Sequence, residues 1–185
     1  IAGNLLEEWL DMDDFYREYN NLVFTVPADL FIPAGGRPET IDGQNWRAFL
    51  DEQGMPTARV IVEGANSFIT PEARVQLQKS GVVIMRDASA NKCGVISSSY
   101  EIIANLLLSE REFLEHKERY VRDVLVILEK RAEDEARLIL RRRRESGNTQ
   151  LYTEISDLIS QNINSYYTRL FDFFSGRPEL CLQNP

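Results

Sequence analysis

Three short apolar runs in the first half of the chain have the pattern of buried strands. They span residues 29–33, 59–63 and 82–86, and the last two are rich in β-branched side chains without polar alternation. Such runs are typical of strands covered on both faces, as in a parallel sheet. We therefore predict three neighbouring parallel strands with helices on the faces of the sheet.

The segment between the second and third runs carries a helix start. Thr70 is a good N-cap, and a proline and an acid follow it directly, as the first turn of a helix favours. Lys79–Gly81 ends this helix. The result is a β-α-β unit, so the residues after its strands, at 63–66 and 87–91, are expected at the sheet edge where α/β proteins bind ligands.

The N-terminal third shows weaker patterns. Apolar residues recur at helical spacing over residues 3–20, and the Asn20-Asn21 pair is expected to break this helix before a short strand at 22–26. A short helix that carries Trp46 and Leu50 is predicted to begin at Asp42-Gly43.

The second half of the chain is predicted to be helical. Ser98 and Glu101 fit a capping box that opens a long helix, which continues to about Arg144 with a break near Ser109. A last helix is expected from Thr149 to Ser175. We expect its apolar stripe to pack against the preceding helix as a helical hairpin; the stripe comprises Leu151, Ile155, Leu158, Ile163, Tyr166, Leu170 and Phe174.

Composition excludes several classes of protein. The 185 residues suffice for one domain or slightly more, and 43% hydrophobic with 27% charged residues is ordinary for a globular protein. The net charge of -8 argues against a nucleic-acid partner. Cys93 and Cys181 form no disulfide framework, His116 is the single histidine, and no long apolar stretch or signal peptide is present. We expect neither a metal site nor a membrane segment.

Four consecutive arginines, Arg141–Arg144, precede the end of the long helix. Cations at a helix C-terminus interact favourably with the helix dipole. Phosphate binding is the alternative interpretation.

Candidate binding residues follow the predicted strands. Ala34 and Gly35 lie in a small-residue loop, which would let a ligand or another backbone approach closely, although a plain tight turn explains them equally well. The amides of Asn66 and Asn91 both donate and accept, which suits a ribose hydroxyl or a carboxamide; each could instead cap a loop or helix. Ser98 could bind a carboxylate at a helix N-terminus, or act only as the N-cap.

These motifs, in this order, resemble a known family. Ile61–Asn66 (IVEGAN), Ile69–Ala73 (ITPEA) and Asp87–Val95 (DASANKCGV) are similar to the cofactor domain of glutamate dehydrogenases. Leu30–Ile41 (LFIPAGGRPETI), together with the serines at 97–99, resembles the large NAD-specific enzymes of fungi and bacteria. The resemblance covers about residues 28–107.

The resemblance implies oxidative deamination of L-glutamate to 2-oxoglutarate and ammonia with reduction of NAD. By motif, Ala34, Gly35 and Asn66 would line the dinucleotide, Asn91 would lie near the nicotinamide and substrate, and Ser98 would contact a substrate carboxylate. Cys93 departs from the glycine or alanine expected there. The implied protein is a homo-oligomer of the cytoplasm, with the mitochondrion as the alternative compartment.

Other family features are absent from the chain. It contains no G-x-G-x-x-G phosphate loop and no motif for the catalytic lysine and aspartate, and it opens with Ile1 rather than Met. We therefore expect an inactive fragment without catalytic residues, completed by the rest of the same polypeptide. Its fold class would be α/β: residues 1–110 form the second half of a Rossmann-like NAD-binding domain with about three strands, and 111–185 a C-terminal helical region.

Two alternatives stay open. A sister dehydrogenase acting on leucine, valine or phenylalanine would share this domain plan, although Ser98 and the match to the large enzymes favour glutamate. A non-catalytic helical interaction module is the other alternative, because the phosphate loop is missing.

Overall fold

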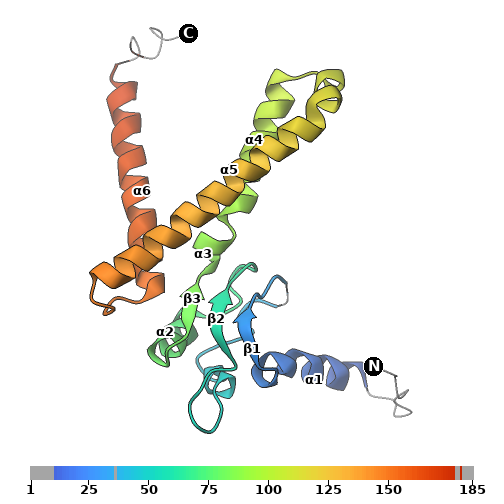
Figure 1. The fold of residues 1–185 in the computed structure, drawn as a ribbon, viewed down its shortest axis with the longest axis vertical. Helices are drawn as coiled ribbons and strands as arrows, with labels where there is room; N and C mark the ends of the chain where they lie inside the picture. The colour runs from blue at the N-terminus through green and yellow to red at the C-terminus, as the bar shows by residue number, and fades with distance from the viewer. Residues whose placement is uncertain (1–10, 36, 178–179, 181–185) are drawn as a thin grey trace.

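The computed structural model describes residues 11–35, 37–177 and 180 and is an α/β fold with a long helical extension (Figure 1). Its elements, in chain order, are α1 (Met12–Thr25), β1 (Ala28–Phe31), the 3-10 helix η1 (Trp46–Phe49), β2 (Ala58–Val62), α2 (Pro71–Lys79), β3 (Val83–Met85), α3 (Asp87–Ala90), α4 (Lys92–Leu107), α5 (Glu110–Glu145) and α6 (Tyr152–Ser175).

The three predicted strands form one parallel sheet, which confirms the prediction. Its order is β1-β2-β3, with Leu30 opposite Val60 and Val60 opposite Val83. All three strands therefore end at the same edge. The Glu63 amide extends the ladder by donating to the Met85 carbonyl at 2.9 Å.

The main core lies on the face of the sheet that α2 and η1 cover. Ile61 and Ile84 from the strands meet Leu77 from α2 and Phe49 from η1, and all four side chains are essentially inaccessible to solvent. The opposite face is less complete, since Leu30 and Ile32 stay 47% and 53% exposed. Within the described residues, the expected helical cover is therefore full on one face only.

Helix α2 begins and ends as the sequence predicts. The Thr70 hydroxyl accepts a hydrogen bond from the Ala73 amide at 3.3 Å, and Pro71 occupies the first helical position. Gly81 follows the helix with a φ of 92°, a conformation that costs a glycine little. This short crossover returns the chain to β3.

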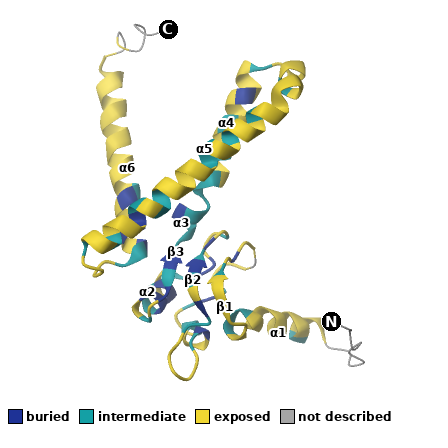
Figure 2. Cartoon of the chain, viewed as in Figure 1, coloured by how far each residue is buried: buried dark blue, intermediate teal, exposed yellow. Residues whose placement is uncertain are grey.

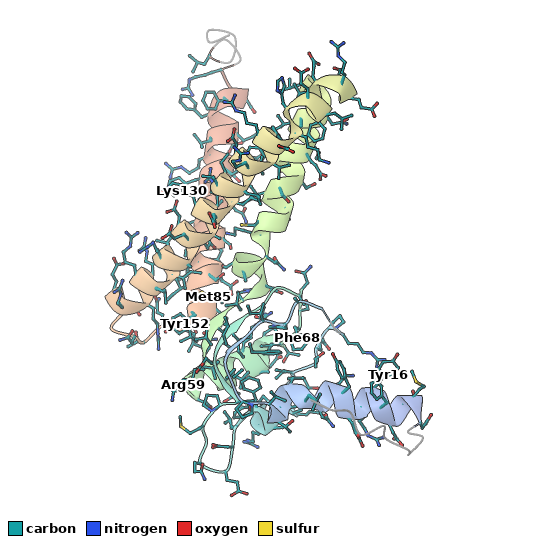
Figure 3. All side chains as sticks on the ribbon, turned by 45° about the vertical axis from the view of Figure 1, so that its right-hand side comes forward. Tyr16, Arg59, Phe68, Met85, Lys130 and Tyr152 are labelled. Atoms are coloured by element: carbon teal, nitrogen blue, oxygen red, sulfur yellow. The ribbon has the colours of Figure 1, made fainter. Side chains whose placement is uncertain are left out.

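The helices α4, α5 and α6 extend away from the sheet. Figure 1 shows α4 running out beside the returning α5, and α6 leaving the end of α5 at a wide angle. At the junction with the sheet, Ile139, Ile155 and Ile159 form a second cluster with Met85 of β3 and Tyr152 of α6. Met85 and Tyr152 are labelled at this junction in Figure 3.

Burial of α6 is confined to side chains of its first two turns, which corrects the expected packing of its apolar stripe. Of the predicted stripe, Ile155 is buried, beside Ile159, where α6 crosses α5 and β3, whereas Leu158, Tyr166 and Leu170 are 46%, 64% and 57% exposed. Figure 2 shows the outer part of α6 in the exposed class. Because α6 diverges from α5, the two helices form a hairpin in contact only near their connection.

The strand expected at residues 22–26 is wrong. Helix α1 continues through Asn20-Asn21 to Thr25, because Val23 and Phe24 pack on the core as part of its last turn. Pro27 explains the stop, since the residue before a proline is pushed out of helical geometry; Val26 is extended. The predicted helical residues 3–10 lie outside the described residues.

The helix start predicted at Ser98 is also wrong. Helix α4 begins at Lys92, so Ser98 lies at its seventh position, and its neighbours Ser97 and Ser99 bond to carbonyls of the preceding turn. The capping box is at Ser109 instead: its hydroxyl accepts from the Glu112 amide, and its amide donates to the Glu112 carboxylate at 2.9 Å. The break expected near Ser109 is therefore confirmed.

Two other helix starts are later than predicted. Around Asp42 the chain forms a turn, in which the carboxylate accepts from the amides of Gln44 and Asn45, and a single 3-10 turn follows from Trp46. The last helix begins at Tyr152 rather than near Thr149.

Candidate functional site

The loops after β1 and β2 meet at the carboxyl edge of the sheet. The Ala65 amide donates to the Pro33 carbonyl at 2.7 Å, which ties the two loops together. Gly64 permits this approach, because a Cβ at this position would lie 3.3 Å from the Pro33 oxygen and 3.5 Å from the Ala34 Cα. Ala34 and Gly35 are exposed beside it, whereas Gly36 lies outside the described residues.

The structure brings Asn66 and Asn91 together at this edge. The Asn91 amide nitrogen donates to the Asn66 side-chain oxygen at 2.5 Å and lies 3.4 Å from the Gly64 carbonyl. Among the hydrogen bonds of the described residues, the Asn91 oxygen and the Asn66 amide nitrogen have no partner. One acceptor and two N–H donors therefore remain for a ligand.

The sequence predicted that Asn91 lies in a loop, but the structure places it between two helices. The one-turn helix α3 follows β3 directly, and Asn91 connects it to α4. Ser98 is two turns further along α4, roughly 10 Å from Asn91 at 1.5 Å per residue. It is exposed and does not lie at a helix N-terminus. The structure therefore groups Ala34, Asn66 and Asn91 but leaves Ser98 at the margin of the site.

A buried ion pair supports the β2 loop, and the sequence reasoning missed it. Glu63 is fully buried, and Arg74 of α2 donates to both its carboxylate oxygens, at 2.8 and 3.0 Å. The Ile69 amide donates to the same carboxylate at 3.3 Å. The available signal was an acid at the end of an apolar strand, with an arginine three residues before Leu77 on the buried side of α2.

Asp87 joins this pair to the next loop. Its carboxylate lies 3.3 Å from the Arg74 guanidinium and accepts from the Ser67 amide at 2.9 Å and the Ala88 amide at 2.8 Å. Arg74 thus bridges the ends of β2 and β3. The loop that presents Asn66 and the short helix that precedes Asn91 are held by one shared cation.

The net pKa shifts of the two carboxyl groups have opposite directions. Burial raises the pKa of Glu63, and the hydrogen bonds and charge of Arg74 offset only part of that effect. Burial also raises the pKa of Asp87, but the Ser67 and Ala88 amides and the charges of Arg74 and Arg86 outweigh it, so its pKa lies below the ordinary value. The Arg74 guanidinium lowers the pKa of both carboxyl groups, but the lowering effects prevail only at Asp87.

Two other residues that the sequence singled out, Arg143 and Cys93, make contacts within the protein. Arg143 donates to the Gln150 carbonyl and lies over the Tyr152 ring, so it closes the α5–α6 connection. The Cys93 thiol donates to the Leu128 carbonyl of α5 at 3.5 Å. Cys181 lies outside the described residues.

Neither a metal cluster nor a membrane segment is found within the described part of the chain. No group of three or more histidine, cysteine or acidic residues there could hold a metal ion. The helices of the same residues lack the combination of length and apolar content that a membrane crossing needs.

The arrangement suits a ligand that carries hydroxyl and carboxamide groups. Unpaired amide donors and an acceptor lie over an open sheet edge, beside a loop of small residues. This set of groups fits the riboside end of a dinucleotide. A dinucleotide bound here would need other residues for its pyrophosphate, because the chain has no G-x-G-x-x-G loop.

The parallel sheet with amide side chains at its carboxyl edge defines an α/β protein of the Rossmann-like class. A sequence profile of the glutamate/leucine/phenylalanine/valine dehydrogenases matches residues 7–151. The chain therefore belongs to the glutamate/leucine/phenylalanine/valine dehydrogenase family.

Similar proteins are NAD-specific glutamate dehydrogenases and their relatives. The chain is 39% identical over 147 residues, 74% of its length, to a probable NAD-specific glutamate dehydrogenase of Schizosaccharomyces pombe. It is 38% identical over 174 residues, 88% of its length, to glutamate dehydrogenase 2 of Dictyostelium discoideum. A stretch of 95 residues, 51% of the chain, is 46% identical to the NAD-specific glutamate dehydrogenase of Saccharomyces cerevisiae. The matches span only 13%, 16% and 9% of these relatives, respectively.

Proposed function

We propose that this chain is part of an NAD-dependent glutamate dehydrogenase, which oxidises L-glutamate to 2-oxoglutarate and ammonia. The observation that carries the proposal is the meeting of Ala34, Asn66 and Asn91 at the carboxyl edge of the parallel sheet in a member of this family. The names of the similar proteins support glutamate and NAD over other family substrates and cofactors.

In this proposal the chain binds and orients the cofactor. Ala34 and Gly35 leave room for the dinucleotide, Asn66 donates to it, and the Asn91 oxygen accepts from the carboxamide or from the substrate amino group. Bound NAD would supply the hydride acceptor. Ser98, further along α4, would contact a carboxylate of the substrate.

The catalytic lysine and aspartate are proposed to come from the rest of the same polypeptide. Lys92, the lysine beside Asn91, is already paired with Glu135 of α5 at 2.7 Å. In the described residues β1 is an edge strand, and the exposed Leu30 and Ile32, with the groove that Tyr19, Val23 and Phe31 line, support contact with further chain at this strand. The division into a cofactor part (1–110) and a helical region (111–185) belongs to the same proposal.

The proposed complete protein is a homo-oligomer of the cytoplasm without a nucleic-acid or membrane partner. The exposed apolar side chains of outer α6 support association, with the rest of the chain or with another copy. The net charge of -8 disfavours nucleic acid.

A substrate assay on the complete polypeptide tests the proposal. NADH absorbance is followed with L-glutamate and, separately, with leucine, valine and phenylalanine. We expect glutamate and NAD to give the highest kcat/KM, Asn91→Ala to reduce turnover, and Asn162→Ala, an exposed asparagine on α6, to leave it unchanged. Preference for an apolar amino acid would assign the sister activity, and no turnover with any of them would favour the interaction module.

A further inference from the structure

Three side chains from three helices meet around the segment that carries Asn91. Ser89 of α3 and Lys92 of α4 flank Asn91 in sequence, and both bind the same oxygen of Glu135 in the C-terminal half of α5. The Ser89 hydroxyl lies 2.9 Å from Glu135 Oε1, and the Lys92 ammonium lies 2.7 Å from it. A residue of the helical extension therefore holds both sides of the candidate site residue.

Helix α6 adds a fourth side chain to this cluster. Ser156 is almost fully buried, and its hydroxyl lies 2.6 Å from that of Ser89. An ionised carboxylate only accepts hydrogen bonds, so Ser89 uses its one proton toward Glu135 and must accept from Ser156. The chain of donors runs from Ser156 through Ser89 to Glu135, and Lys92 balances the carboxylate charge.

The opposite side of the same segment is tied to the sheet edge. Asn91 donates to Asn66, and Asp87 accepts from the Ser67 amide. Residues 87–92 are thus held between the β2 loop and α5. Without the contacts to α5, the segment would keep its bonds at the sheet edge, the Arg74–Asp87 contact and the Ser89–Ser156 hydrogen bond, but nothing would hold it from the side of α5.

We propose that Glu135 is a positioning residue, which acts through Lys92 and Ser89 to set the place and orientation of Asn91 at the cofactor edge. The inference rests on the proposed function, because it assigns Glu135 a role in that reaction. Glu135 itself touches neither Asn91 nor the ligand edge. Only 11% of the Glu135 side chain is exposed, whereas the acids of the ion pairs Lys130–Asp134 and Glu133–Arg137 on the same helix are 59% and 58% exposed.

The test uses the complete polypeptide with Glu135→Gln, Lys92→Met and Lys92→Arg. Glu133→Gln is the matched control, since Glu133 pairs with Arg137 on the exposed side of the same helix. Two readouts are required: steady-state kinetics, and amide hydrogen exchange of residues 87–95, whose helical bonds include Asn91 N–H to Asp87 at 2.9 Å.

We expect Glu135→Gln to lower kcat roughly tenfold, which corresponds to about 1.4 kcal/mol, and to leave the KM values for glutamate and NAD within about twofold. Exchange of residues 87–95 should accelerate by a similar factor. Lys92→Met should have an effect of similar size, and the double variant should lose less than the sum of the two, because Lys92 and Glu135 share one contact. Lys92→Arg should recover most of the activity, and Glu133→Gln should resemble wild type.

The two readouts separate the possible failures. Unchanged exchange in Glu135→Gln would overturn the positioning role whatever the activity. Faster exchange with unchanged kcat would also overturn it, since the contact would then only fasten α5 to the domain. A wild-type polypeptide that does not oxidise glutamate with NAD would refute the proposed function instead, and the exchange result would then decide alone whether Glu135 holds the segment.

Discussion

Removing Arg74 should destabilise the fold far more than its single position in a nine-residue helix suggests. Arg74→Met deletes two hydrogen bonds to Glu63 and the 3.3 Å contact with Asp87, and it leaves the fully buried Glu63 carboxylate without a cation. Breaking a buried pair from one side costs about 3–5 kcal/mol. We expect a loss of that size in the free energy of unfolding.

Urea denaturation of the purified 185-residue chain measures this loss. With an m-value of about 2 kcal/mol/M, the midpoint should fall by about 1.5–2.5 M. Arg59→Met, at an exposed arginine of β2, is the matched control and should change stability by less than about 0.5 kcal/mol. The double variant Glu63→Gln/Arg74→Met should recover part of the loss, because no charge then remains buried while an oxygen still accepts from Ile69.

The deficit of Arg74→Met should also depend on pH. The pKa of Glu63 is already raised above 4.5 by burial, and loss of the guanidinium raises it further. A folded state that holds the proton more tightly than the unfolded state loses stability as pH rises from the unfolded pKa through the folded pKa. The deficit should therefore be smaller near pH 4.5 than at pH 8. A loss below about 1 kcal/mol at pH 8, indistinguishable from Arg59→Met, would refute the claim that this pair holds the loop.

Three further outcomes are expected. In the complete enzyme, Asn91→Ala should lower kcat, whereas Ser98→Ala should chiefly raise the glutamate KM, by about 1–3 kcal/mol equivalent. Steady-state kinetics within twofold of wild type for both variants would limit Asn91 and Ser98 to structural roles. The 185-residue chain alone should fold, yet neither bind NAD tightly nor turn over glutamate. A few hydrogen bonds of roughly 0.5–1.5 kcal/mol each fall short of the ~8 kcal/mol that micromolar binding needs. Micromolar affinity measured by calorimetry would mean an additional phosphate site, and Arg141–Arg144 would be the first place to search. The stability advantage of wild type over Asp87→Asn should be present above pH 3.8 and shrink as pH falls through the lowered folded pKa of Asp87. Urea denaturation at each pH measures this advantage. An advantage independent of pH would show that the charge of Asp87 contributes nothing to stability.

Local signals predicted those elements whose formation depends on neighbouring residues. The apolar runs at 59–63 and 82–86 form strands, and Thr70 caps α2, because a β-branched run and an N-cap act within a few residues. Asn66 and Asn91 could be placed at one edge because parallel strands share their carboxyl ends. The same logic failed at Ser98, where a plausible capping pair lies inside a helix that had already begun at Lys92.

Elements that depend on distant partners could not be predicted. Residues 22–25 are helical because Val23 and Phe24 pack on the core, not because of their local propensity. The stripe on α6 predicted burial, but the angle between α5 and α6 leaves its outer half exposed. An amphipathic pattern states which side of a helix is apolar and not whether anything covers it.

The sequence by itself determined the strand runs, the cap of α2 and the order of the family motifs, since each is a property of adjacent residues. Only the tertiary structure decided that Arg74 would join Glu63 to Asp87, and that Glu135 would meet Ser89 and Lys92 from 46 and 43 residues away. The physical reason is that a buried charge is tolerated only beside its partner, and the fold brings distant partners together.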